Sequence, residues 1–231
     1  MQGGLILYGE IEEGAFMGRD SRFSAHVRLS SGPAKCHVKS TARLGELLVP
    51  GARAIVAKAK GAARATAYDL VAVYKGGALF NIDSQAPNKV FGHFAREGGF
   101  APGLTLIKPE WNFGDSRFDF YLEAAAFRGA VEVKGVTLER DGIGYFPDAP
   151  TERGVKHLLG LMKLRAQGLD ACACFILQFE GAAGFAPNEK THPEFAKTLR
   201  EASEAGVLLR AYRCAVRENG FEIAEEVPIL L

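Results

Sequence analysis

Three ionisable residues in the middle of the chain have the types and spacing of a cation-dependent site. Glu132 and Lys134 stand two residues apart in a segment, residues 129–138, whose alternation of polar and apolar residues predicts a β-strand. Both side chains should therefore leave the strand on the same face. Asp119 lies in the preceding predicted strand, residues 117–123, and antiparallel pairing of the two strands would bring it close to Glu132.

Two carboxylates that share one site repel each other and favour a hard divalent cation such as Mg²⁺ or Mn²⁺. A cation of this kind polarises a phosphoryl group and lowers the pKa of its bound water, and a neighbouring lysine stabilises the negative charge that develops on phosphorus. The spacing therefore predicts Asp119 and Glu132 as metal ligands, and Asp119, Glu132 and Lys134 as the catalytic residues of a phosphodiesterase. From spacing alone, a surface pair on a strand is the more common origin of a Glu-x-Lys triplet, and that alternative stays open.

Other chemistries have little support in the sequence. The chain has no phosphate-binding G-x-x-x-x-G-K-[ST] loop, no G-x-S-x-G nucleophile motif and no strand-linked G-x-G-x-x-G. Its four cysteines form no C-x-x-C, and its five histidines lack the spacings of a zinc site. We therefore expect buried thiols, and neither nucleotide-driven, acyl-transfer nor zinc chemistry.

The elements that must position these residues change in character after residue 85. Before it, short segments separated by turn residues predict strands and so a closed or partly open barrel: 5–13, 22–29, 34–39, 52–59, 67–74 and 78–83. After it, helices alternate with strands, which predicts an α/β domain with a mixed sheet. The helices are expected at 88–96, from about 151, and at 193–205, and the strands at 117–123, 129–138, 171–179 and 207–212. With 231 residues, the chain accommodates both domains, 1–85 and 86–231.

Positive charge is concentrated in the first domain, although the whole chain has a formal net charge of only +1. Residues 35–64 contain seven lysines and arginines and a single acidic residue, Glu46. Such a stretch is a candidate nucleic-acid surface or, alternatively, the solvated face of a small basic domain. The residues expected to contact DNA phosphates here are Lys39, Arg43, Lys58, Lys60 and Arg64.

The helix expected from Thr151 carries a second basic group. Its apolar residues recur at helical spacing, and Arg153, Lys156 and His157 are expected together on the opposite face. An N-cap at Thr151 and an i, i+4 pair of Glu152 with Lys156 explain part of this pattern as helix stabilisation. We also expect Lys156 and Arg153 to contact DNA phosphates.

Long segments of the chain resemble one known family. Glu-Val-Lys-Gly-Val-Thr-Leu at 132–138 and Phe-Pro-Asp-Ala-Pro-Thr-Glu-Arg-Gly-Val-Lys-His-Leu at 146–158 are similar to the hallmark of the sugar fermentation stimulation protein A family. Ser-Arg-Phe-Asp-Phe at 116–120 and Arg-Leu-Gly-Glu-Leu-Leu-Val-Pro-Gly at 43–51 extend the resemblance over nearly the whole chain. The family is a bacterial and archaeal group regarded as DNA-binding. The resemblance implies an N-terminal OB-type β-barrel followed by a restriction-endonuclease-like α/β domain, with Asp119, Glu132 and Lys134 at the positions of its nuclease-like pattern.

These observations together predict a two-domain DNA-binding protein with a Mg²⁺- or Mn²⁺-dependent nuclease core. The alternatives are a non-catalytic DNA-binding regulator of carbohydrate genes that keeps the nuclease fold, and an RNA-binding or RNA-processing protein, because OB barrels bind single strands of either nucleic acid. The chain has no apolar run of the roughly 18 residues that a membrane span requires, and its first ten residues do not resemble a secretory signal. We therefore expect a cytoplasmic protein without a membrane partner.

Overall fold

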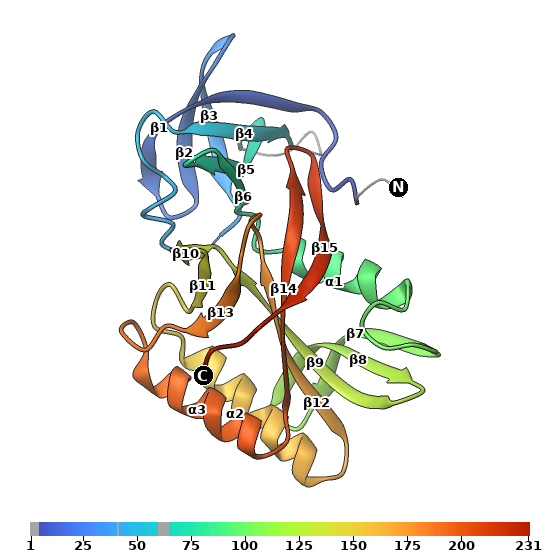
Figure 1. Ribbon diagram of the computed structural model, residues 1–231. Helices are drawn as coiled ribbons and strands as arrows, with labels where there is room; N and C mark the ends of the chain where they lie inside the picture. The colour runs from blue at the N-terminus through green and yellow to red at the C-terminus, as the bar shows by residue number, and fades with distance from the viewer. Residues whose placement is uncertain (1–4, 41, 60–64) are drawn as a thin grey trace.

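The N-terminal part of the molecule is a β-barrel. The structure, a computed structural model, describes residues 5–40, 42–59 and 65–231. Figure 1 shows the barrel strands above a second, larger domain. They are β1 (Ile11–Ser21), β2 (Ser24–Leu29), β3 (Gly32–Val38), β4 (Arg53–Lys58), β5 (Tyr68–Lys75) and β6 (Ala78–Asn81). They pair in the order β3-β2-β1-β4-β5-β6, and a parallel pairing of β3 with β5 closes β1 to β5 into the barrel of an OB domain.

The first strand differs from its expected position. The predicted strand 5–13 is wrong, because β1 begins at Ile11 and continues to Ser21. The apolar residues before it lie against the C-terminal domain instead: the backbone N–H groups of Leu7 and Tyr8 both donate to the carbonyl of Asn219. Within β1, Gly14 allows β1 to approach β2 closely, since a Cβ there would lie 2.6 Å from the carbonyl oxygen of Arg28.

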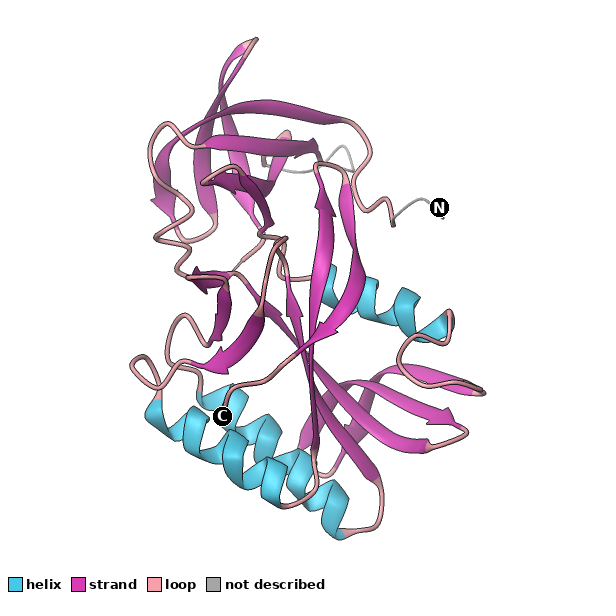
Figure 2. Cartoon of the chain, viewed as in Figure 1, coloured by secondary structure: helices cyan, strands magenta, loops and turns pink. Residues whose placement is uncertain are grey.

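The C-terminal domain is built on a mixed sheet with helices on both faces, as Figure 2 shows. The strand order is β15-β14-β12-β9-β8-β7, with β12 parallel to both β9 and β14. Helix α1 (Ala86–Arg96) packs on one face, and α2 (Glu152–Ala166) with α3 (Pro193–Glu204) covers the other. The strands are β7 (Leu106–Phe113), β8 (Ser116–Ala124), β9 (Phe127–Val136), β12 (Asp170–Leu177), β14 (Leu208–Arg217) and β15 (Gly220–Val227). Among the described helices, none has both the length and the apolar character that a membrane crossing requires.

A small second sheet lies beside the large one. It consists of β10 (Leu138–Arg140), β11 (Ile143–Phe146) and β13 (Gly184–Pro187), in the order β10-β11-β13. The sequence predicted none of these strands, because each is only three or four residues long and has no clear alternation. Its strands β10 and β11 lead the chain from β9 to the start of α2, so they help to place α2 against the end of β9.

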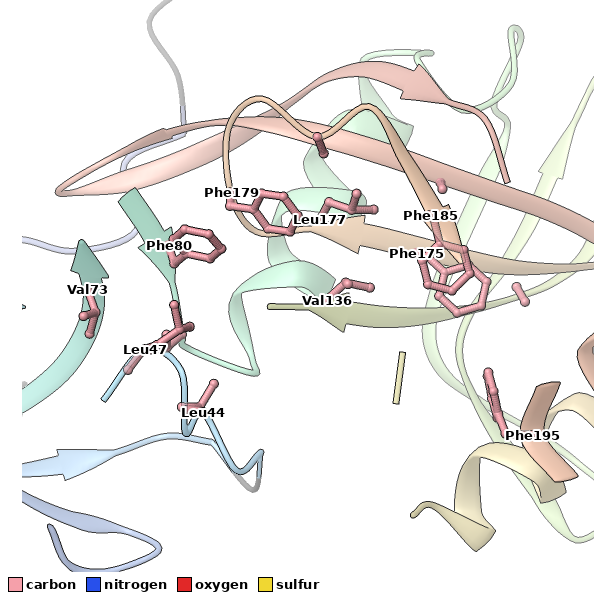
Figure 3. Packing of buried hydrophobic residues seen from close by; sticks show 14 of the residues in the cluster. Leu44, Leu47, Val73, Phe80, Val136, Phe175, Leu177, Phe179, Phe185 and Phe195 are labelled. Atoms are coloured by element: carbon pink, nitrogen blue, oxygen red, sulfur yellow. The ribbon is translucent and has the colours of Figure 1, made fainter. Parts of the chain in front are cut away.

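One hydrophobic core runs through both domains. Phe80 on β6 stacks on Phe179, just after β12, with ring centroids 4.9 Å apart. Figure 3 shows this pair between the barrel residues Leu44 and Leu47 and residues of the C-terminal domain such as Leu177. Because the two domains share buried aromatic rings, their relative position is fixed by packing and not by a flexible linker.

Candidate nuclease site

Asp119 is fixed in place by two hydrogen bonds at the point where β8 leaves β9. The regular pairing of the two strands ends at Phe120 with Val131. Beyond that pair, Asp119 Oδ2 accepts a hydrogen bond of 2.8 Å from the backbone N–H of Val133. Its Oδ1 accepts one of 2.7 Å from the side-chain amide of Asn88 on α1. A strand pairing and a helix therefore orient this carboxylate together.

Glu132 lies on β9 and is nearly inaccessible to solvent, with 4% of its surface exposed. Its Oε1 atom contacts both Lys134 Nζ and His157 Nδ1. Its Oε2 atom is buried and accepts no hydrogen bond from any residue that the structure describes. A buried carboxylate oxygen without a partner is costly, so this atom is a natural ligand for a cation.

His157 is the site residue that the sequence analysis missed. It was expected on the polar face of α2 with Arg153 and Lys156, but it is buried and faces Glu132. Arg153 Nε donates to its Nε2 atom over 3.4 Å, which leaves the proton of a neutral ring on Nδ1, directed at Glu132. Helical spacing could have revealed this placement, because His157 precedes the buried residues Leu161 and Leu164 by four and seven positions.

Electrostatics separate the two carboxylates. Burial and the nearby charge of Glu132 raise the pKa of Asp119. The charge of Lys134 and the two hydrogen bonds that Asp119 accepts, from Val133 and Asn88, act to lower it. For Glu132, burial also acts to raise the pKa, but the Lys134 charge and the contact with His157 outweigh it and lower the pKa. Glu132 thus favours its ionised form more than a free glutamate does, whereas Asp119 favours it less than a free aspartate does.

These residues line a cleft of about 940 Å³ between the barrel and the C-terminal domain. Asp119, Glu132 and Lys134 all line it, so the structure brings the three predicted residues together. Four arginines also line the cleft, three from the barrel and one from α2: Arg19, Arg22, Arg43 and Arg153. The cleft therefore combines the Asp119–Glu132 pair with four arginines and two further carboxylates, Asp20 and Asp148, so that cationic groups for a phosphodiester strand lie beside a candidate cation site.

The structure distributes the other predicted DNA contacts over several places. Arg43 and Arg153 line the cleft. Lys39 pairs with Asp69 at 3.1 Å and with Asp83 at 3.3 Å, and the exposed Lys58 pairs with Glu10 at 2.9 Å.

The remaining predicted contacts lie away from the cleft or outside the described residues. Lys156 is exposed and lines a separate groove of about 870 Å³ together with Lys163 and Leu159. Lys60 and Arg64 lie outside the described residues. Of the predicted DNA contacts that the structure describes, Arg43 and Arg153 therefore line the cleft of Asp119 and Glu132, and Lys39, Lys58 and Lys156 do not.

Both domains match models of one protein family. The family description "SfsA N-terminal OB domain" matches residues 17–82, and "Sugar fermentation stimulation protein RE domain" matches residues 85–220. The chain belongs to the sugar fermentation stimulation protein family. The predicted family and the predicted fold, an OB barrel followed by an α/β domain, are confirmed.

Relatives in this family match over nearly their whole length. A sugar fermentation stimulation protein homolog of Desulfitobacterium hafniense is 46% identical, over 97% of this chain and 98% of that protein. The homolog of Ruminiclostridium cellulolyticum is 43% identical, over 97% and 99%. A solved structure, described as Pyrococcus furiosus SfsA in complex with Ca²⁺, has a TM-score of 0.88 and 27% identity, and covers 98% of this chain and 99% of that one.

The donor set of the site fits a divalent cation. Two carboxylates from adjacent strands supply oxygen ligands, and Glu132 Oε2 is already desolvated and without a partner. No cluster of three or more histidine, cysteine, aspartate or glutamate side chains suited to a metal occurs in the part of the chain that the structure describes. A two-carboxylate site is what Mg²⁺ and its analogues use when water and substrate phosphate complete the coordination.

Proposed function

We propose that this family member is a metal-dependent phosphodiesterase that cleaves nucleic acid, with DNA as its principal substrate and Mg²⁺ or Mn²⁺ as its cofactor. The observation that carries the proposal is the buried, unpartnered Oε2 of Glu132 beside Asp119 and Lys134, in a cleft with an arginine wall. The Pyrococcus furiosus relative forms a complex with Ca²⁺, which supports the proposal because Ca²⁺ and Mg²⁺ both take oxygen ligands.

In this proposal each residue of the site has one task. Asp119 and Glu132 hold the cation, which when bound activates water and polarises the phosphodiester. Lys134 stays beside Glu132 and neutralises the charge that grows on the phosphoryl oxygens. Arg22, Arg43 and Arg153 bind phosphates along the cleft and hold the strand in place.

A cleavage assay tests the proposal. The purified protein is incubated with single-stranded DNA, duplex DNA and RNA, in Mg²⁺, in Mn²⁺ and in EDTA. We expect metal-dependent cleavage by the wild type and a loss of about a hundredfold or more in Lys134→Ala, with nucleic-acid affinity largely retained, since one transition-state charge contact is removed. Asp119→Asn should be similarly inactive, and Glu204→Gln, an exposed carboxylate on α3, serves as the matched control.

The same assay separates the catalytic proposal from its alternative. If the wild type cleaves none of these substrates in either metal, while it and the variants bind DNA equally, the nuclease proposal is wrong. The protein would then be a DNA-binding protein that keeps a nuclease fold.

A further inference from the structure

An aromatic ring of the barrel is exposed next to the cleft. Phe23, in the turn between β1 and β2, has 49% of its surface exposed, whereas Phe16 on β1 is buried in the barrel core. Its ring stacks on the ring of His37 from β3, with centroids 6.4 Å apart and an interplanar angle of 29°. The two rings therefore form a platform in which the Phe23 ring is half exposed to solvent.

Hydrogen bonds fix this platform before any ligand is present. The carbonyl oxygen of Phe23 accepts from the backbone N–H of Val38 at 3.0 Å and from Nδ1 of His37 at 3.1 Å. The second of these bonds ties the two stacked residues together. Because these bonds hold the His37 ring and the backbone of Phe23, these groups lose little further conformational freedom when a ligand stacks on the platform.

The platform is also tied to the wall of the cleft. Arg19 donates to the carbonyl of Arg22 at 3.1 Å and to the carbonyl of Arg43 at 2.8 Å, so one guanidinium links the β1–β2 turn to the Arg43 loop. The backbone N–H of Arg43 in turn donates to Asp148 of the C-terminal domain at 2.6 Å. Arg22, the residue immediately before Phe23, itself lines the cleft.

We propose that Phe23 and His37 bind an unpaired nucleobase by stacking, while Arg22 and Arg43 bind the phosphates of the same strand as it enters the cleft. Within a duplex both faces of an internal base are covered by its neighbours, so only an unpaired base can stack on a protein ring. The proposal rests on the proposed function for its ligand, nucleic acid, and adds the substrate class: a strand with an unpaired segment on the barrel side of the cut.

Binding measurements in EDTA test this platform without cleavage. The probe is a single-stranded DNA with one 2-aminopurine base, compared with its duplex and with a single-stranded RNA of the same sequence. Phe23→Leu removes the aromatic ring but keeps an apolar side chain, and Phe23→Trp keeps the ability to stack. Met17→Leu, at an exposed apolar position on the neighbouring strand β1, is the matched control.

We expect Phe23→Leu to bind the single strand about tenfold more weakly, which is the usual effect of losing one stacked base. Phe23→Trp and Met17→Leu should keep the wild-type affinity, and the affinity for the duplex should not change. The 2-aminopurine fluorescence should be quenched by the wild type and by Phe23→Trp but not by Phe23→Leu. A loss on RNA alone or on DNA alone identifies which strand the platform binds.

Three outcomes overturn the proposal: unchanged single-strand affinity in Phe23→Leu, an equal loss on the duplex, or no binding of either strand by the wild type. The nuclease proposal stands or fails separately. If the wild type cleaves DNA and Phe23→Leu binds normally, only the platform is wrong. If the platform behaves as expected and no substrate is cleaved, only the catalytic part of the proposed function is wrong.

Discussion

The two oxygens of the Glu132 side chain have different surroundings. Oε1 is held by Lys134 and His157, and Oε2 is buried without a partner among the described residues. The first oxygen orients the carboxylate and the second is left for a ligand. His157 is a positioning residue in this account, since it acts through Glu132, and Arg153 in turn orients its ring.

This role of His157 leads to a testable prediction. His157→Leu removes the N–H that holds Glu132 Oε1, so we expect Mn²⁺ affinity and cleavage rate to fall roughly 10- to 100-fold, the usual effect of losing a partner of a metal ligand. His157→Asn, whose amide can still donate, should recover part of both. Thermal melting monitors folding of each variant. Unchanged Mn²⁺ affinity in a folded His157→Leu protein would show that His157 only fills space.

At the scale of elements, the site depends on the pairing of β8 with β9 and on the approach of α2. The sequence predicted both strands and the start of α2, because their apolar periodicity is regular and Thr151 is a favourable N-cap residue. In the structure the backbone N–H of Gly154 donates a 3.0 Å hydrogen bond to Thr151 Oγ1. The residue type of His157 did not indicate its helical face, since a histidine is compatible with either, and only its spacing to Leu161 and Leu164 indicates the buried one. Strand β7 was missed because it contains Pro109 and a left-handed residue, Glu110 with φ of 53°.

The contact of β9 with β12 gives a prediction about stability. Their parallel pairing includes Gly129 with Asp170, and a Cβ on Gly129 would overlap the carbonyl of Asp170. Gly129→Ala should therefore force the strands apart and reduce the free energy of unfolding by about 2 kcal/mol or more. Gly9→Ala, where nothing lies within 4 Å of the added methyl group, is the control. Chemical denaturation measures both, and equal stability of the two variants would contradict the observed packing.

The whole molecule has little net charge, so its interaction with nucleic acid must depend on where charges lie. The barrel was expected to bind DNA along residues 35–64, but Lys39 is engaged with Asp69 and Asp83 at the domain junction. The arginines that line the cleft are Arg43 from that stretch, Arg19 and Arg22 from β1 and the turn after it, and Arg153 from α2. The core that both domains share brings these arginines together. They come from separate parts of the sequence, so no single segment of it reveals that they line one cleft.

Joint binding of a divalent cation by Asp119 and Glu132 is the central claim, and titration calorimetry with Mn²⁺ measures it directly. We expect the wild type and Glu204→Gln to bind Mn²⁺ with equal, micromolar to millimolar affinity and to melt at a higher temperature when it is present, because the cation binds the folded state. Asp119→Asn, which keeps the shape of the side chain but lacks its charge, should lose both effects. Equal Mn²⁺ affinity in Asp119→Asn and the wild type would contradict the account.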